Sequence, residues 1–236
     1  MTLGDEKVKN WNRVSFPNKI KYAERHGYAF ISCDHLLDDR PPGWSKIILL
    51  LQHLSNYDYL FWTDTDSLII ETHIRLESLL SSKHDLTFCV GGSKEEQLAL
   101  TPNTGAFFVK NSRWSRDFLT TVYDQQFLVN KCDAQGKWVA QSSDHQKQRA
   151  KCKCLGCRTF KYDQKAFVHV LHHMLPEEKK KHIACYEPAN FLYFNGYGSA
   201  YQPGCFLYHL PGVHKNYQIF LKAAQHVREK NEFLSI

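Results

Sequence analysis

Apolar residues along the chain alternate between helical and extended spacing. Ile47, Leu50 and Leu54 fall on one face of a helix, and Pro41-Pro42 marks its start. The short apolar run at 59–62 is typical of a buried strand. The same patterns predict further helices at 16–26, 73–82, 112–127, 163–174 and 217–230, and strands at 28–33, 67–70, 85–90, 105–111 and 205–210. This alternation predicts a single α/β domain over 1–236, with a mostly parallel central sheet flanked by helices.

One segment departs from the alternation. Residues from about 128 to 161 are polar, rich in Lys, Gln and Cys, and show no period, which indicates an insertion or a mobile loop. Cys152, Cys154 and Cys157 crowd into it as "KCKCLGC". A zinc site would need a fourth ligand such as Cys132 or His145, and C-x-C-x-x-C is not a strong zinc pattern. Disulfides or free thiols are therefore favoured over zinc here.

The composition is that of an ordinary globular protein. Hydrophobic residues make up 43% of the chain and charged residues 23%, which excludes a disordered chain. The formal charge of +6 is spread out, apart from a cluster at 179–181 that reads as a solvated turn or helix end, so a nucleic-acid partner is not expected. No apolar run is long enough to span a bilayer.

Two carboxylates stand one residue apart at the end of the predicted strand "YLFW". Asp64 and Asp66 would repel each other unless a cation lies between them, so the pair predicts a divalent metal site. Replicative DNA polymerases use such pairs, but they need a much larger chain and a basic channel. Haloacid-dehalogenase phosphatases carry the pair after their first strand, whereas here a helix–strand–helix unit precedes it. Nucleotide-sugar glycosyltransferases, in which the pair holds a metal at the donor diphosphate, suit the mid-domain position.

Six motifs, in this order along the chain, resemble glycosyltransferase family 34, the galactosyl, xylosyl and mannosyl transferases that include plant xyloglucan xylosyltransferases and fungal Golgi enzymes. They are "NKIKYAERHGY", "GWSKIILLLQHL", "YLFWTDTDSLI", "NTGAFFVKNSRWSRDFL", "YDQKAFVHVL" and "GCFLYHLPGVHK". The resemblance spans roughly 18–215 and implies a GT-A fold, a divalent cation (Mn²⁺ or Mg²⁺) and sugar transfer with retention of configuration.

The resemblance also implies roles for residues in the third and sixth motifs. Asp64 and Asp66 would bind the metal together with His209, whose imidazole favours Mn²⁺. In the H-x-x-G-x-x-K pattern, Gly212 would let the backbone approach the donor and Lys215 would contact its diphosphate. The alternative is that His209 is a buried strand residue with no role in metal binding.

Further residues are assigned to the donor by the same resemblance. Asn103 and Gly105 would form the sugar pocket, unless they simply make a turn before a strand. Asp163 and Gln164 would face the anomeric carbon: a front-face reaction and a double displacement with Asp163 as nucleophile both stay open, and Asp163 also suits a helix N-cap. Lys46 is either a nucleotide ligand or a solvated lysine. Thr65, between the paired carboxylates, is also expected at the donor.

The aromatic stretch at 190–201 is the candidate acceptor platform. Tyr193, Phe194 and Tyr197 could stack on sugar rings, and core packing is the equally weighted alternative. Departures from the family pattern are Tyr162, where plant members have an acidic residue, and Cys205, where an aspartate is common. The first strand before the 16–26 helix is barely present: either "MTLG" is its remnant or the chain starts late through truncation.

These features predict a glycosyltransferase that uses a nucleotide-sugar donor, with a UDP-sugar favoured, and a glycan acceptor. A weakened sugar- or nucleotide-sugar-binding protein and a metal-dependent phosphoryl-transfer enzyme are the alternatives. Family relatives lie in the Golgi lumen behind an N-terminal membrane anchor that is absent from this chain; a complete soluble form would be cytoplasmic.

Overall fold

The structure is a computed structural model that describes residues 1–91, 94–98, 101–132, 134, 138–154, 162–198, 202–211 and 216–230. The strands are β1 (Thr2–Leu3), β2 (Ser32–Cys33), β3 (Tyr59–Thr63), β4 (Ser67–Ile69), β5 (Leu86–Val90), β6 (Pro102–Lys110), β7 (Asn130–Cys132), β8 (Trp138–Ala140), β9 (Ile183–Tyr186), β10 (Asn195–Gly196) and β11 (Leu207–His209). The helices are α1 (Lys9–His26), α2 (Pro42–His53), α3 (Lys94–Leu98), α4 (Arg113–Tyr123), α5 (Ser143–Lys151), α7 (Gln164–His173), α8 (Pro176–His182) and α9 (Tyr217–Lys230).

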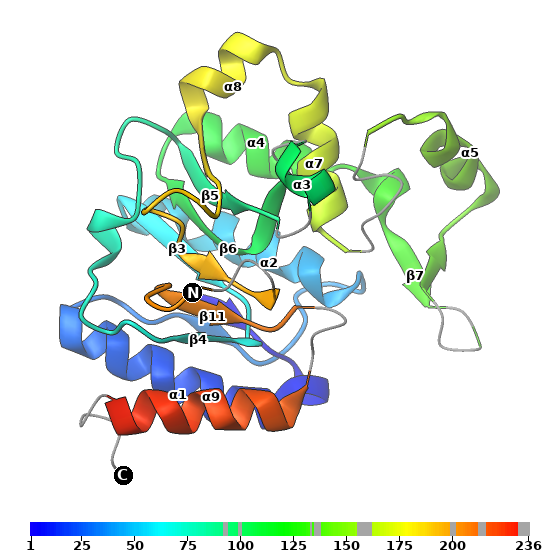
Figure 1. Ribbon diagram of the computed structural model, residues 1–236. Helices are drawn as coiled ribbons and strands as arrows, with labels where there is room; N and C mark the ends of the chain where they lie inside the picture. Colours follow the sequence, from blue (N-terminus) through cyan, green and yellow to red (C-terminus); the bar gives the residue numbers. More distant parts are fainter. Residues whose placement is uncertain are drawn as a thin grey trace.

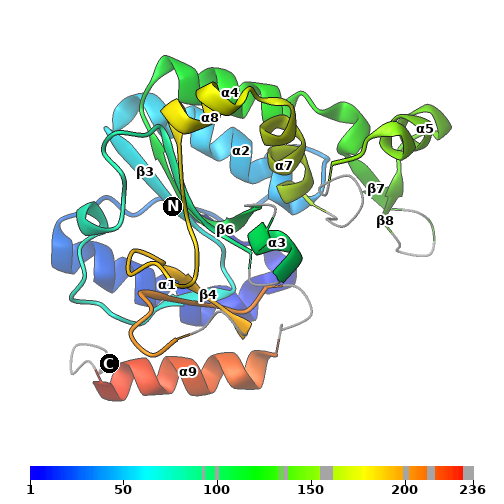
Figure 2. The same cartoon turned by 45° about the horizontal axis from the view of Figure 1, so that its top comes forward.

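A four-stranded sheet in the order β3-β6-β5-β9 forms the centre (Figure 1). Helices α2, α4 and α7 pack on one of its faces over a core that includes Trp44, Phe107 and Phe167. The other face meets the small sheet β10-β11-β4 through a second core that includes Phe61 and Phe206. Helices α1 and α9 lie beyond the small sheet, as both views show (Figures 1 and 2).

The predicted α/β class is confirmed, but the sheet is mixed, not mostly parallel. Strand β6 runs antiparallel to both β3 and β5, while β5 and β9 are parallel. The short α3 lies between β5 and β6, so the chain turns back beside β5 without the long crossover that a parallel neighbour needs. Apolar runs alone do not report strand direction.

The first strand is short but present. Strand β1 pairs in parallel with β2, and the amide of Thr63 in β3 donates to the carbonyl of Met1 at 3.0 Å. "MTLG" therefore supplies a two-residue strand at the edge of β3.

Helix α1 ends where the sequence predicts but buries a different face. Gly27 caps it with φ of 73°, a left-handed conformation that glycine adopts without strain. The apolar Ile20 is 36% exposed, whereas the polar Asn18 and Lys19 are buried. These polar side chains are satisfied by backbone carbonyls of the β3–β4 region, so hydropathy misreads this helix.

Two other segments differ in detail from the pattern-based expectation. The helix predicted at 73–82 is only a 3₁₀ turn at Leu76–Ser78, and the chain beside it wraps the second core through buried Leu79. The segment at 128–161 contains the β7–β8 hairpin and helix α5, which stand out from the rest of the fold (Figure 1). Among the described residues, no helix is long and apolar enough to cross a membrane.

Candidate active site

The paired carboxylates lie in the short loop between β3 and β4. The amide of Asp64 donates to the carbonyl of Gly105 at 2.8 Å, and the ammonium of Lys19 donates to the carbonyl of Asp64 at 2.7 Å. Beyond the loop, β4 pairs antiparallel with β11, and this register sets His209 opposite Ser67. Sheet pairing thus brings a histidine from the last strand beside the acidic loop.

Asp64, Asp66 and His209 form a cluster that fits a divalent cation. One ligand atom from each lies within 4.8 Å of the other two, and the Nε2 of His209 is 3.3 Å from Oδ1 of Asp66. His209 is 1% exposed, and within the described residues its Nε2 makes no hydrogen bond. A buried ring nitrogen that has no hydrogen-bond partner and faces two carboxylates is typical of a metal ligand.

The ring of His209 is held from two sides. Its Nδ1 lies 3.2 Å from the side-chain oxygen of Asn195, a contact that orients the imidazole. Gly105 lies against the ring: a Cβ at that position would sit 2.0 Å from Cε1 of His209. Gly105 was expected to leave room for a sugar; in the structure it leaves room for the histidine.

A buried lysine joins the acidic loop to the start of α7. The Nζ of Lys46 lies 2.9 Å from Oδ2 of Asp163, 3.2 Å from Oδ1 of Asp64 and 2.8 Å from the carbonyl of Thr104. Burial disfavours the charged ammonium, but the carboxylates of Asp163 and Asp64 outweigh it and raise the pKa of Lys46. Lys46 is thus buried, not solvated, and its ammonium links the carboxylates of Asp64 and Asp163.

Contacts to both carboxylate oxygens hold the side chain of Asp163 in place. Its Oδ2 accepts hydrogen bonds from the hydroxyl of Thr104, at 3.2 Å, and from the ammonium of Lys46. Its Oδ1 lies against Gly43, where a Cβ on that residue would be only 2.2 Å away. Asp163 precedes α7 but makes no side-chain cap. The neighbouring Gln164 accepts from the amide of Thr104 at 3.5 Å. Asp163 thus stands at the N-cap position of α7, as the alternative held, but its side chain makes no capping hydrogen bond.

A cavity of about 400 Å³ opens beside this network. Its lining includes Lys46, Thr65 and Asp163, together with both carboxylates of the acidic loop. Tyr162, one of the departures from the family pattern, is 46% exposed and lines the cavity as well. The hydroxyl of Thr65 donates to Asn12 at 2.6 Å, which anchors the loop to α1.

Two other predicted donor residues lie outside the described residues: Gly212 and Lys215. Asn103 is 5% exposed, and its side-chain oxygen accepts from the amide of Gly105 at 2.8 Å. Asn103 and Gly105 both lie inside β6, so the alternative of a turn before a strand is wrong.

The expected acceptor platform is largely core. Phe194 is 0% exposed and packs edge-on against Phe108, and Tyr193 is 6% exposed with its hydroxyl donating to the carbonyl of Val90 at 3.3 Å. Neither ring offers a face to a sugar, so the packing alternative holds for both. Tyr197 lies edge-on to His209, with ring centroids 5.9 Å apart.

Sequence reasoning missed several partners of the site: Trp62, whose indole donates to Oδ1 of Asp64 at 2.7 Å, and also Lys19, Thr104 and Asn195. Trp62 lies in the predicted strand, two residues before Asp64. Its indole N–H, a hydrogen-bond donor on the same side of the strand as Asp64, could have indicated this contact. Lys19 and Thr104 lie inside the first and fourth quoted motifs, whereas Asn195 lies outside all six.

The sequence profile of the galactosyl transferase GMA12/MNN10 family matches residues 3–90 of the chain, a span that includes the acidic loop. Over this span the chain is similar to the glycosyltransferases of this family.

Relatives with curated names agree. The Saccharomyces cerevisiae protein "Probable alpha-1,6-mannosyltransferase MNN10" is 31% identical over an alignment that covers 49% of this chain and 38% of the yeast protein. "Xyloglucan 6-xylosyltransferase 2" of Arabidopsis thaliana is 29% identical over 45% of this chain and 24% of the plant protein. The chain thus spans well under half the length of either relative.

Solved structures show that this chain has the GT-A fold. A glycosyltransferase involved in glycosylation of the major capsid of PBCV-1 superposes with a TM-score of 0.60 at 13% identity, covering 97% of this chain and 98% of that one. The galactosyltransferase LgtC, solved with donor and acceptor sugar analogs, superposes with a TM-score of 0.53 at 10% identity, covering 95% and 94%.

Proposed function

We propose that this chain carries the catalytic site of a metal-dependent glycosyltransferase, which moves a hexose or pentose from a nucleotide-sugar to a glycan hydroxyl with retention of configuration. The carrying observation is the convergence of Asp64, Asp66 and His209, of which both carboxylates line a cavity that Lys46 and Asp163 also border. A UDP-sugar is the favoured donor. The family resemblance supports a Golgi-lumenal setting.

The three clustered side chains would hold Mn²⁺ in preference to Mg²⁺, because an imidazole joins the carboxylates. When bound, the cation supplies positive charge to the donor diphosphate and so favours departure of the nucleotide. The chain's own contribution is orientation: Gly105 and Asn195 fix the ring of His209, and Trp62 fixes the carboxylate of Asp64.

The position of Asp163 favours the front-face reaction. In that reaction the acceptor hydroxyl attacks the anomeric carbon on the side from which the nucleotide leaves, and its proton passes to the leaving phosphate. Asp163 then stabilises the positive charge that develops on the sugar. As a nucleophile, Asp163 would first have to give up its contacts with Lys46 and Thr104, at 2.9 and 3.2 Å. Gln164 contributes a neutral dipole beside it.

A thermal-shift series tests the donor site. UDP, GDP and their sugars are each added with Mn²⁺ and, in parallel, with EDTA. A ligand at a hundred times its dissociation constant stabilises the folded state by about 2.7 kcal/mol, which is measurable. A Mn²⁺-dependent shift with one nucleotide supports the proposal and names the base; the absence of any shift contradicts it.

A transfer assay separates the alternatives. Sugar transfer or donor hydrolysis with Mn²⁺ is expected, and donor binding without either would favour the weakened binding protein. Phosphate release from an aryl phosphate that is lost in Asp64→Asn would instead establish phosphoryl transfer.

A further inference from the structure

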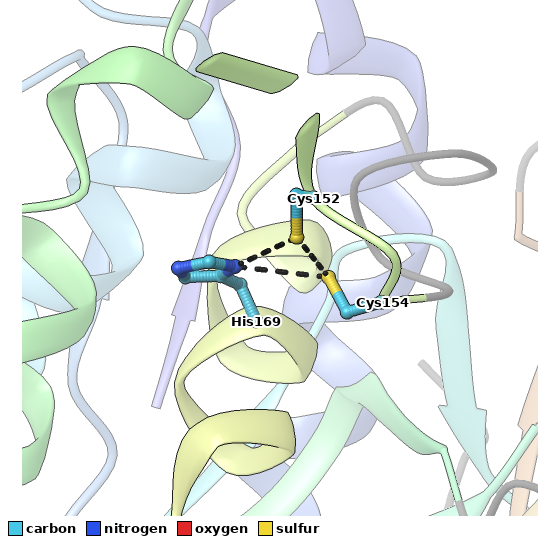
Figure 3. Close-up of side chains that lie close together, drawn as sticks. All are labelled: Cys152, Cys154 and His169. Carbon is cyan, nitrogen blue, oxygen red and sulfur yellow. Dashed lines mark hydrogen bonds between the residues drawn. The ribbon is translucent and has the colours of Figure 1, made fainter. Parts of the chain in front are cut away.

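A second cluster of metal-ligating side chains lies away from the acidic loop. Cys152 and Cys154 follow the end of α5, and His169 lies in the middle of α7 (Figure 3). The two Sγ atoms are 3.1 Å apart, and the Nδ1 of His169 is 3.4 Å from one and 3.7 Å from the other. The histidine stands 15 residues beyond Cys154, outside the C-x-C-x-x-C pattern, which is why that pattern looked incomplete.

We propose that Cys152, Cys154 and His169 bind a structural Zn²⁺ ion that fastens α5 and the β7–β8 hairpin to α7. Two thiolates and one imidazole are the ligands that zinc prefers among divalent cations. The two thiolates cancel the charge of the ion, so it enters a half-buried site without a net charge to desolvate.

The spacing of the ligand atoms suits a tetrahedral ion. Zn–S bonds of about 2.3 Å and Zn–N bonds of about 2.0 Å, at tetrahedral angles, place sulfur and nitrogen about 3.6 Å apart and two sulfurs about 3.8 Å apart. The two S–N distances of 3.4 and 3.7 Å bracket the first value. Only the sulfurs, at 3.1 Å, have to separate slightly on binding.

The surroundings hold the three ligands in place. Arg149, in the last turn of α5, donates to the carbonyls of Phe127 and Val129 at 2.6 and 2.8 Å, which fixes the end of the helix just before Cys152. The ring of Phe127 lies edge-on to His169, with centroids 5.1 Å apart. Cys154 is 1% exposed. A site that is ordered in advance loses little conformational entropy when an ion binds.

Of the two predicted fourth ligands, only His145 can be placed relative to this cluster. His145 lies outside the group whose ligand atoms converge, as far as the chain is described, and the side chain of Cys132 is outside the description. A further side chain would complete the four-coordinate shell that a structural zinc ion has.

Metal analysis tests the proposal independently of glycosyl transfer. The wild-type chain, purified under reducing conditions and dialysed without chelator, is expected to hold about one zinc, as measured by mass spectrometry of the metal. The double variant Cys152→Ser/Cys154→Ser and the variant His169→Gln are each expected to hold at least about tenfold less. The matched controls His172→Gln, an exposed histidine on the same helix, and Cys185→Ser should retain it.

An acidic-loop variant separates the two sites. Asp66→Asn is expected to keep its zinc. The zinc proposal would therefore remain supported even if the nucleotide-sugar proposal failed. Zinc lost in Asp66→Asn but retained in His169→Gln would overturn it.

X-ray absorption on the wild-type zinc protein covers the case in which a variant does not fold. Two or three sulfurs at about 2.3 Å with at least one imidazole nitrogen support the site. A coordination shell without sulfur or without imidazole contradicts it, as does a zinc-free wild type in which Cys152 and Cys154 form a disulfide.

Discussion

Two histidines, on elements far apart in the chain, each meet a pair of side chains of different chemistry. His209 meets the carboxylates of Asp64 and Asp66, while His169 meets the thiols of two cysteines. Carboxylates favour hard cations, whereas thiols favour soft ones such as zinc. Burial and the neighbouring His173 and His172 lower the pKa of His169 to about 4, so its imidazole is neutral.

The two clusters also differ in what surrounds them. The carboxylates border a cavity of about 400 Å³, while none of the three residues of the thiol cluster is among its described lining residues. Catalytic metal sites keep a position open to substrate, and structural sites are closed. This difference supports the two proposals, a catalytic metal site at the acidic loop and a structural zinc site between α5 and α7.

Removing a carboxylate should have the largest effect. Asp66→Ala is expected to abolish Mn²⁺-dependent donor binding and to lower transfer by about 100-fold or more, because a catalytic cation supplies several kcal/mol. Titration of Mn²⁺ and UDP by calorimetry measures the loss, and His209→Ala should behave alike. Asp39→Ala, in the same cavity lining, should keep Mn²⁺ binding. If either ligand variant bound metal and donor normally, that ligand assignment would be wrong.

Breaking the buried ion pair should cost stability. Lys46→Met leaves the carboxylate of Asp163 buried without its cation, which is expected to lower the free energy of unfolding by about 3–5 kcal/mol in urea melts. The control Lys9→Met removes an exposed ion pair with Glu6 and should change stability by less than about 0.5 kcal/mol. Equal losses in the two variants would show that Lys46 is not coupled to Asp163 as described.

A methyl group at Gly105 should disturb the carboxylate cluster alone. In Gly105→Ala the new Cβ meets the ring of His209, so the affinity for Mn²⁺ should fall by about 10–100-fold while zinc content stays constant. Gly27→Ala is the control: no atom lies within 4 Å of its Cβ, so its positive φ should cost about 1 kcal/mol of stability and leave Mn²⁺ binding intact. An unchanged Mn²⁺ affinity in Gly105→Ala would argue against His209 as a ligand.

The smallest effect is expected at Asn195. Asn195→Ala removes the contact to Nδ1 of His209 and should weaken Mn²⁺ binding by about tenfold, because orienting partners contribute less than ligands do. Calorimetric titration again provides the measurement. A loss as large as that of Asp66→Ala would mean that Asn195 does more than orient the ring.

Much of the fold followed from local pattern. Continuous apolar runs predicted β3 and β5 because both are buried, and the end of α1 followed from Gly27. The position of the acidic loop at a strand end followed from the apolar run before it. Strand direction did not follow, because β6 has the same apolar character in either orientation.

Contacts between distant segments were out of reach of pattern reasoning. Aromatic rings such as Phe194 look alike in sequence whether they pack in a core or face a sugar. His169 has no motif linking it to the cysteines, and only the docking of α5 near α7 brings them together. The ion pairs of Lys46 were not predicted, because its two acidic partners come from other elements.

The polar face of α1 has a consequence for self-association. Strand β4 lies at the edge of its sheet, where unpaired backbone groups invite a strand from another molecule. Asn18 donates to the carbonyl of Ile69 and accepts from its amide, at 3.0 and 2.8 Å, and Ser15 donates to the carbonyl of Ser67 at 3.1 Å. The helix thereby occupies the hydrogen-bonding positions that an intruding strand would take. An aliphatic residue in place of Asn18 would leave the amide and carbonyl of Ile69 without these hydrogen bonds. The edge of β4 would then be able to pair with a strand from another molecule.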